Sequence, residues 1–254
     1  MSKEFSNKVA LVTGASRGIG AATSLALARQ GMGKIFLHYR SYRQGAEKTL
    51  AEVRKAGSEG ELLCADLTTS SGIHELIHNL QQRKAEVDVL INNAGALIQR
   101  TNLADFSEDL FDRVMTLNVK SVWFITQAVV PAMLRRSGGV IVNLSSIAAR
   151  NGGASGAVVY GAAKAAVAAM TKGLARELAP QGIRVNAISP GTVDNYFHEQ
   201  FSTREILAKV VAATPAGRLG TNEEMADAIV FLCSDKSRYI YGQTIELNGG
   251  IYMV

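Results

Sequence analysis

Short runs rich in β-branched residues alternate with longer segments of helical period, and this alternation constrains the fold more than any other feature. The runs expected as strands are KVALVT (8–13), KIFLHY (34–39), ELLCA (61–65), VDVLINN (87–93), GVIVNLS (139–145), IRVNAIS (183–189) and QTIEL (243–247). The helical segments are 18–30, 43–55, 72–83, 107–135, 158–179, 205–213 and 223–234. The order predicts a doubly wound, mostly parallel α/β sheet of about seven strands, Rossmann-like, with ligands beyond the carboxyl ends of the strands.

Length and charge narrow the class further. The 254 residues are 47% hydrophobic and 19% charged and contain no internal repeat, which predicts a single globular domain over 1–254. The net charge of +5 comes from Lys and Arg that are interleaved with acids and form no basic block. We therefore expect anionic small-molecule ligands and no nucleic-acid partner.

Two further features bear on location and redox chemistry. The start, MSKEFSNKVALVTG, has no apolar core of signal-peptide length, and the apolar runs elsewhere are shorter than a membrane span. We expect a cytoplasmic protein without a membrane partner. Cys64 and Cys233 each lie in an apolar segment, which predicts buried thiols in place of a disulfide or a metal pair.

The stretch TGASRGIG, Thr13 to Gly20, follows the first strand and opens into a helix. Glycines at 14, 18 and 20 allow a tight turn, close approach of a phosphate and packing of the helix on the sheet. The spacing G-x-x-x-G-x-G departs from the ordinary dinucleotide pattern, so a purely structural turn remains an alternative.

The second strand ends in LHYRSYR, where an NAD site usually places an acid for the ribose 2′-hydroxyl. Tyr39 and Arg40 stand there instead, the next acid is Glu47, and Arg17 lies in the glycine loop. Two guanidinium groups would bind a 2′-phosphate, which favours NADP(H) over NAD(H). The alternative is a solvated Arg40 at a helix start.

Tyr160 and Lys164 are four residues apart on a predicted helix and therefore project side by side. An adjacent ammonium stabilises a phenolate and lowers its pKa, so the pair forms a plausible acid/base device. The spacing alone is weak, but one strand delivers Ser145 and Ser146 to the same rim of the sheet and TLNVKS supplies Asn118.

HELIH, from His74 to His78, fits the zinc-peptidase pattern H-E-x-x-H. The apolar stripe of that helix is formed by Ile73, Leu76, Ile77 and Leu80, which turns both histidines toward solvent. No third ligand follows at the usual distance, so we expect no metal site.

TGASRGIG, CADLT, NNAG, NVKS, the serine strand, YGAAK, SPG and a final NGG occur in an order that resembles the short-chain dehydrogenase/reductase family, from about Lys8 to the C-terminus. The resemblance implies reversible hydride transfer between a nicotinamide cofactor and a carbonyl or secondary alcohol. Tyr160 would be the general acid for reduction, Ser146 would hydrogen-bond the carbonyl oxygen, and Lys164 would bind the nicotinamide ribose. The backbone carbonyl of Asn118 would hold a water that feeds protons to Lys164.

The resemblance also implies a cofactor site. Within it, Asp66 would bind the adenine amino group, and Gly191 and Val193 would approach the carboxamide. Relatives often have threonine where this chain has Asn195, which places that contact in question. The implied cofactor-binding residues are Gly14, Ser16, Arg17, Gly18, Ile19, Gly20, Tyr39, Arg40, Asp66, Leu67, Asn92, Ala94, Gly95, Tyr160, Lys164, Pro190, Gly191 and Val193.

The C-terminal segment, ending NGGIYMV, resembles the subgroup that contains bacterial 3-oxoacyl-carrier-protein reductases. That resemblance implies a 3-oxoacyl thioester substrate, an acyl carrier protein as a partner and a homotetramer built on the two long helices and the C-terminal strand. Gln181 stands where those reductases often have arginine, which leaves Arg135 and Arg136 as nearby carrier contacts. Tyr196, Phe197 and Phe201 could cover an acyl chain. A dehydrogenase of a sugar, cyclic ketone or small alcohol, and a cofactor-sensing regulator, are the alternatives.

Overall fold

The computed structural model describes residues 5–253, and these form one seven-stranded parallel sheet in the order β3-β2-β1-β4-β5-β6-β7. Its strands are β1 (Val9–Val12), β2 (Lys34–Tyr39), β3 (Glu59–Cys64), β4 (Val89–Asn92), β5 (Gly139–Leu144), β6 (Ile183–Pro190) and β7 (Thr244–Leu247). The strand order reverses between β1 and β4, which is where doubly wound folds bind their ligands. The predicted fold class is confirmed.

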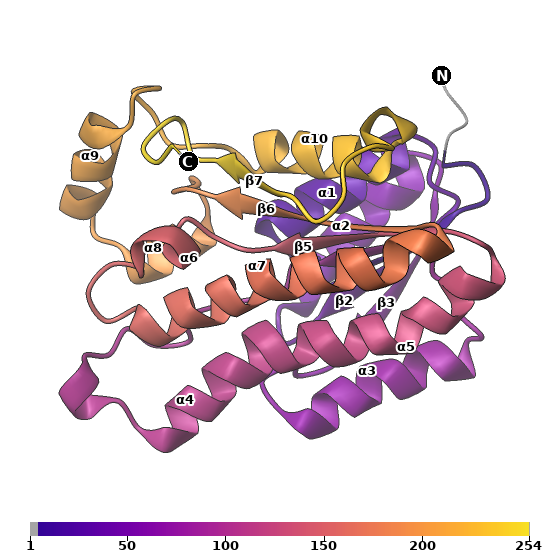
Figure 1. Cartoon of the computed structure of the whole chain (residues 1–254), viewed down its shortest axis with the longest axis horizontal. Helices are drawn as coiled ribbons and strands as arrows, with labels where there is room; N and C mark the ends of the chain where they lie inside the picture. The colour runs from indigo at the N-terminus through magenta and orange to yellow at the C-terminus, as the bar shows by residue number, and fades with distance from the viewer. Residues whose placement is uncertain (1–4, 254) are drawn as a thin grey trace.

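Helices cover both faces of the sheet (Figure 1). One face carries α1 (Gly18–Arg29), α2 (Arg43–Lys55) and α10 (Asn222–Cys233), and the other carries α3 (Ser70–Gln82), α4 (Glu108–Met115), α5 (Ser121–Arg135) and α7 (Val158–Leu178). Three shorter helices, α6 (Ala148–Asn151), α8 (Tyr196–Phe201) and α9 (Arg204–Ala213), lie together at one end of the sheet. The 3-10 turns are η1 (Leu103–Asp105), η3 (Ala179–Gln181) and η4 (Asp235–Ser237), and η2 (Thr116–Lys120) is a π-helix.

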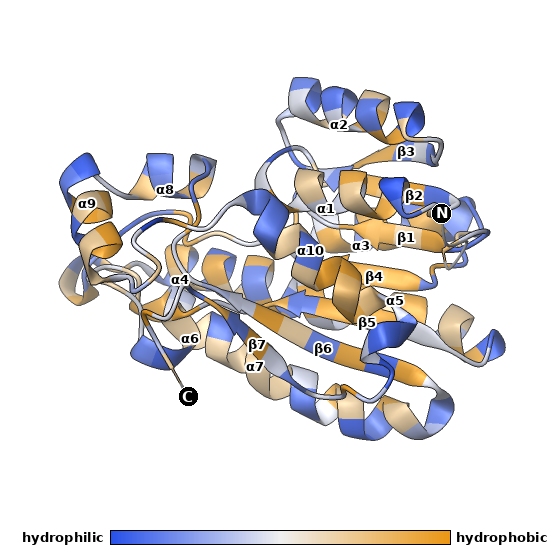
Figure 2. Cartoon of the chain, turned by 90° about the horizontal axis from the view of Figure 1, so that it is seen from above, coloured by the Kyte–Doolittle hydropathy of each residue, from blue (hydrophilic) through white to orange (hydrophobic). Residues whose placement is uncertain are grey.

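The core has two halves because successive strand residues point to opposite faces. Ala10 and Val12 of β1 pack toward Leu27 of α1, whereas Leu11 packs toward the α3 and α5 side with Leu76 and Val129. The central strands β1 and β4 are accordingly apolar along most of their length (Figure 2), as expected for a parallel sheet covered on both faces, whereas β6 also carries the buried polar side chains of Arg184 and Asn186.

One helical stretch, Glu108–Arg135, is long and apolar enough by composition to cross a membrane, with a mean hydropathy of 1.2 over its most apolar window. Run length alone did not reveal this in the sequence. Ile125, Val129 and Met133 of the stretch pack into the core against the sheet, while Phe111 and Trp123 are exposed. One side of this stretch thus packs into the core, and the opposite side carries exposed apolar residues.

Cys64 departs from the sequence expectation. Cys233 is buried, but Cys64 is exposed, because it ends the edge strand β3 and its thiol donates a hydrogen bond to the Arg40 carbonyl oxygen at 3.1 Å. An apolar run on an edge strand has a neighbouring strand along only one of its two edges. The prediction of a buried thiol was wrong at this position.

Candidate active site

A cavity of about 980 Å³ lies beyond the carboxyl ends of the strands. Residues that follow β1, β4, β5 and β6 form its floor, and α8 lies over it. The carboxyl ends of parallel strands meet at one edge of the sheet, so segments far apart in sequence converge here.

The glycine loop, Thr13 to Gly20, is held by hydrogen bonds with side chains at the carboxyl ends of β4 and β2. Gly14 has φ of +69° and Gly18 has φ of +59°, which L-side chains rarely adopt. A methyl group at Gly20 would lie 2.3 Å from the Gly14 carbonyl oxygen, so α1 packs on the turn only without a side chain there. Asn93 Nδ2 donates to the carbonyl oxygens of Thr13 at 2.7 Å and Gly14 at 3.1 Å.

His38 on β2 completes that support. Its Nδ1 accepts a hydrogen bond from the Gly14 amide at 3.1 Å, and its Nε2 lies 3.1 Å from the Ala65 carbonyl oxygen. This pairing requires the tautomer protonated at Nε2. Burial lowers the pKa of His38 to about 4, which keeps the imidazole neutral.

One end of the cavity is cationic. Arg17 and Arg40 both line it, and no Asp or Glu among the described residues does. Arg40 Nη1 lies 4.0 Å from Asp66 Oδ1, a long contact between half-exposed groups. Arg17 has no ion pair with a described carboxylate, and its guanidinium carbon lies 4.4 Å from the Tyr42 ring centroid. This end suits a phosphate.

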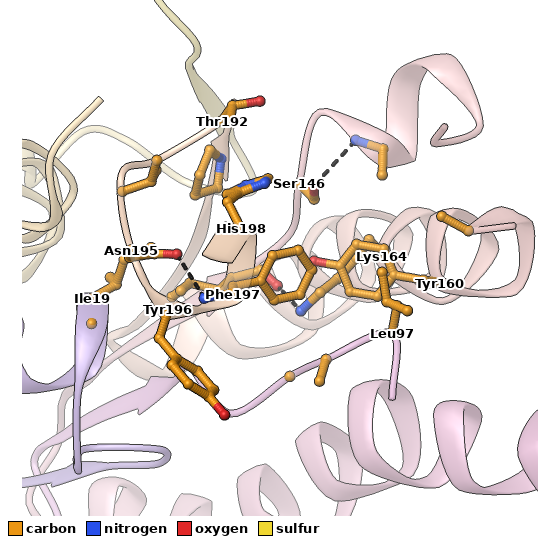
Figure 3. Close-up of a pocket in the computed structure, with 18 of the residues that line it drawn as sticks. Ile19, Leu97, Ser146, Tyr160, Lys164, Thr192, Asn195, Tyr196, Phe197 and His198 are labelled. Atoms are coloured by element: carbon orange, nitrogen blue, oxygen red, sulfur yellow. Dashed lines mark hydrogen bonds between the residues drawn. The ribbon is translucent and has the colours of Figure 1, made fainter. Parts of the chain in front are cut away.

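The acid/base group of Ser146, Tyr160 and Lys164 lines the same cavity (Figure 3). Tyr160 and Lys164 project from α7, with Lys164 Nζ 5.7 Å from the Tyr160 ring centroid and 2.8 Å from the Leu144 carbonyl oxygen to which it donates. Ser146 Oγ accepts a hydrogen bond from the Ala148 amide at 3.1 Å and lies near enough to the Tyr160 hydroxyl to lower its pKa. Ser145 instead donates to the Lys164 carbonyl oxygen at 3.0 Å and ties α7 to the end of β5.

The pKa of Tyr160 shifts opposite to the direction expected from its lysine. Burial raises it to about 12, and the Ser146 hydrogen bond only partly opposes this. Burial also lowers the pKa of Lys164 to about 8. Lys164 does not lower the pKa of Tyr160 because its ammonium is itself desolvated and donates a hydrogen bond to the Leu144 carbonyl oxygen. Tyr160 therefore holds its proton at neutral pH, as a general acid must.

Asn118 lies behind this group, in the π-helical turn η2. Its Nδ2 donates to the carbonyl oxygens of Ala96 and Val114, while its buried Oδ1 has no partner among the described residues. A methyl group at Gly95 would lie 2.7 Å from Asn118 Oδ1 and 2.8 Å from Lys164 Nζ, so both polar atoms face the same small gap. Such π-bulges are frequent at functional sites.

Most of the predicted site residues meet at this cavity. Those that line it are Gly14, Ser16, Arg17, Gly18, Ile19, Arg40, Leu67, Ala94, Gly95, Ser146, Tyr160, Lys164, Pro190, Gly191 and Val193. Five others do not. Gly20 packs against the loop, Tyr39 and Asn118 are buried, Asp66 accepts from Thr68, and Asn92 Nδ2 donates to Asn143 Oδ1 in the core.

The lid α8 carries contacts that the sequence did not predict. Asn195 Oδ1 accepts from the Phe197 amide at 3.1 Å and so caps α8, which accounts for the asparagine at that position. The Phe197 ring lies 5.8 Å from that of Tyr160, whereas Tyr196 points away from it (Figure 3) and covers Arg17. The predicted role of Tyr196 in covering an acyl chain stays a prediction.

His38, Asn93 and Arg100 are cavity residues that sequence reasoning missed. The repeated asparagine of LINNAG was a signal for Asn93, since one amide supports the core and the next supports the loop. His38 was visible in LHYR, but its contact to Gly14 joins segments that no local pattern relates.

Two other sequence features can be placed in the structure. His74 and His78 are exposed, as expected from the apolar stripe of α3. Within residues 5–253, no three His, Cys, Asp or Glu side chains gather closely enough to hold a metal. Arg135 and Arg136 are ion-paired with Glu86, and Arg136 also with Asp88 at 3.0 Å, beside the start of β4. They lie at the end of the sheet opposite the cavity, where the segment after Arg136 packs against Gly182, the neighbour of Gln181, and their role as carrier contacts stays a prediction.

Comparison with known proteins agrees with this geometry. Residues 14–252 match a family profile described as enoyl-(acyl carrier protein) reductase. The chain is 39% identical over 248 residues to 3-oxoacyl-[acyl-carrier-protein] reductase FabG of Staphylococcus epidermidis, covering 97% of this chain and 100% of that protein.

Solved structures match over the whole chain as well. One is described as a candidate NAD(P)-dependent gluconate 5-dehydrogenase from Beutenbergia cavernae with NADP bound at low occupancy (TM-score 0.90, 33% identity, 98% of each chain). Another is an NADH-dependent reductase A1-R′ responsible for alginate metabolism (TM-score 0.89, 34% identity, 100% of each chain). The chain belongs to the short-chain dehydrogenase/reductase family.

Proposed function

We propose that this chain is an NADP(H)-dependent oxidoreductase that interconverts a carbonyl and a secondary alcohol, with residues 1–254 acting as one dinucleotide-binding catalytic domain. The observation that carries the proposal is the convergence of the glycine loop, a cationic end and the Tyr160–Lys164–Ser146 group on one cavity. A cofactor-sensing regulator would have no need for that third component.

The residues present fit a dinucleotide. The left-handed glycines 14 and 18 leave room for a phosphate, and Arg17 has no ion pair with a described carboxylate. We assign the 2′-phosphate to Arg17 and Arg40, the nicotinamide ribose to Lys164, and the carboxamide to the backbone at Gly191 and Val193. When bound, NADPH supplies a hydride to the carbonyl carbon. One structural neighbour is NADH-dependent, so the fold does not decide between the two cofactors. The preference for NADP(H) is therefore assigned from Arg17 and Arg40 of this chain.

Side chains of this protein carry out the proton transfer. Tyr160, held neutral by burial, donates its proton to the carbonyl oxygen, and Ser146 hydrogen-bonds that oxygen and keeps it in line. Lys164 returns a proton toward the phenolate, and the Asn118 backbone carbonyl holds the water that resupplies it. Asn118 Oδ1, buried and unpartnered among the described residues, supports a polar guest in that gap.

For the substrate we favour a 3-oxoacyl thioester. The relative from S. epidermidis is named for that activity, and Leu97, Ile147, Leu207 and Val210 give the cavity an apolar wall. The test is NADPH oxidation with an acetoacetyl pantetheine thioester against sugars and cyclic ketones at saturating cofactor. Turnover confined to a sugar or cyclic ketone would move the substrate to the alternative and leave the oxidoreductase assignment intact.

A specific observation supports a second candidate, an acidic sugar. Arg100 lines the cavity and donates only to carbonyl oxygens, those of Phe201 and Ser155, so it has no ion pair among the described residues. A substrate carboxylate would fit it. If so, Arg100→Gln should lose turnover of a keto acid and spare its neutral amide, whereas Arg204→Gln, outside the cavity, should spare both. An equal loss of turnover for the keto acid and its amide would mean that Arg100 only holds its two backbone partners in place and does not bind a substrate carboxylate.

For partners we propose a homotetramer, an acyl carrier protein as thioester donor, and cytoplasmic residence. The outer side of α4 and α5 exposes Phe111, Trp123 and Leu134, and β7 is an edge strand open to pairing. Light scattering of the wild type and of Trp123→Glu tests the assembly. A tetramer that dissociates in the variant supports it, and a wild-type monomer refutes it.

A further inference from the structure

The lid helix α8 is tied to the cofactor end of the cavity by an aromatic contact that the catalytic group does not use. The Tyr196 ring centroid lies 3.8 Å from the guanidinium carbon of Arg17, and the Tyr42 ring centroid lies 4.4 Å from the same atom. The three side chains come from the lid, the glycine loop and the residue before α2, and all three line the cavity.

Contacts at the two ends of α8 define which part of the cavity the lid helix spans. Asn195 Nδ2 donates to Asn222 Oδ1 at 3.1 Å, which anchors the start of the lid to α10. Arg100 donates to the Phe201 carbonyl oxygen at 3.1 Å and anchors its end. Tyr196 and Phe197 point in different directions between these anchors (Figure 3), one toward Arg17 and the other onto Tyr160. The lid thus spans from the cofactor end to the catalytic tyrosine.

A guanidinium that rests on aromatic rings keeps its N–H groups in the plane of the group, where a phosphate oxygen binds. Arg17 has no ion pair with a described carboxylate to hold it instead. The rings therefore order a long side chain before the ligand arrives, and less conformational freedom is lost on binding.

We propose that Tyr196 is a positioning residue for the cofactor: its ring holds Arg17 in place for the 2′-phosphate. The inference rests on the proposed use of NADP(H). NADH lacks the phosphate and gains little from an ordered Arg17, so Tyr196 contributes to the preference between the two cofactors.

The test compares Tyr196→Phe, which keeps the ring, with Tyr196→Leu, which removes it, by fluorescence titration and stopped-flow release of NADPH and NADH. A cation–π contact of ordinary strength predicts that Tyr196→Leu weakens NADPH binding by about 5- to 30-fold and speeds its release, with NADH changed by less than about threefold. Tyr196→Phe should match the wild type. Tyr239→Leu is the control, since Tyr239 is 96% exposed and outside the cavity.

A double-mutant cycle isolates the coupling. In an Arg17→Ala background, Tyr196→Leu should change NADPH affinity by less than about twofold, because the cation it orders is absent. Additive losses, an unchanged NADPH-to-NADH ratio in Tyr196→Leu, or a loss in Tyr196→Phe equal to that in Tyr196→Leu would overturn the inference. A wild type that binds no dinucleotide, or binds NADH as tightly as NADPH, would instead overturn the proposed function.

Discussion

Gly95→Ala probes the gap behind the catalytic group. The added methyl would lie 2.8 Å from Lys164 Nζ and 2.7 Å from Asn118 Oδ1, whereas ordinary contacts begin near 3.4 Å. The ammonium must therefore retreat by about 0.6 Å, the difference between 3.4 and 2.8 Å. It is held by a 2.8 Å hydrogen bond to Leu144, so the retreat also strains that bond.

A displacement of ~1 Å in a catalytic group can cost ~10²-fold in rate, so we expect kcat to fall by roughly 10- to 100-fold. The assay is NADPH oxidation at saturating carbonyl substrate, with urea unfolding to confirm that the fold survives. Gly173→Ala is the matched control: it lies on α7, has nothing within 4 Å of the added methyl, and should gain about 0.5–1 kcal/mol of stability. A Gly95→Ala enzyme within twofold of wild-type kcat would refute the crowding argument.

Three further outcomes follow from the site. Arg40→Ala should weaken NADPH binding by roughly 10- to 100-fold, measured by fluorescence titration, with little change for NADH, and equal losses would contradict the 2′-phosphate assignment. Because the pKa of His38 is lowered from 6.5 to about 4, the unfolded chain binds its proton first; stability is full above pH 6.5 and falls by about 3 kcal/mol as the pH drops toward 4. Urea unfolding of His38→Asn should show a shallower loss over that range, and an unchanged slope would exclude His38 as its source. Activity should survive EDTA and His74→Ala, and stoichiometric zinc in a chelator-sensitive enzyme would revive the HELIH hypothesis.

The fold could be predicted because its strands are buried on both faces. The segments VALV of β1 and IFL of β2 are apolar without alternation, and the helices between the strands are long enough to bury a stripe. The two acid/base side chains were predictable for a local reason, since their i, i+4 spacing places them on one face of α7.

What escaped prediction depends on contacts between distant segments. Arg17 and Tyr196 are 179 positions apart, and no periodicity relates them. The pKa of Tyr160 was expected to fall because of Lys164, but burial of the whole group outweighs the ammonium and raises it. The ion pair of Arg135 with Glu86 likewise joins segments that no local pattern relates.

The central claim is that Tyr160 supplies the proton in an NADPH-dependent carbonyl reduction. The most direct measurement is Tyr160→Phe, assayed for NADPH binding by fluorescence and for turnover of acetoacetyl thioester by NADPH absorbance. Because only the phenolic oxygen is lost, we expect NADPH affinity within about threefold of the wild type and kcat lower by at least ~10²–10⁴-fold. Near-normal turnover by Tyr160→Phe would contradict the assignment of Tyr160 as the general acid.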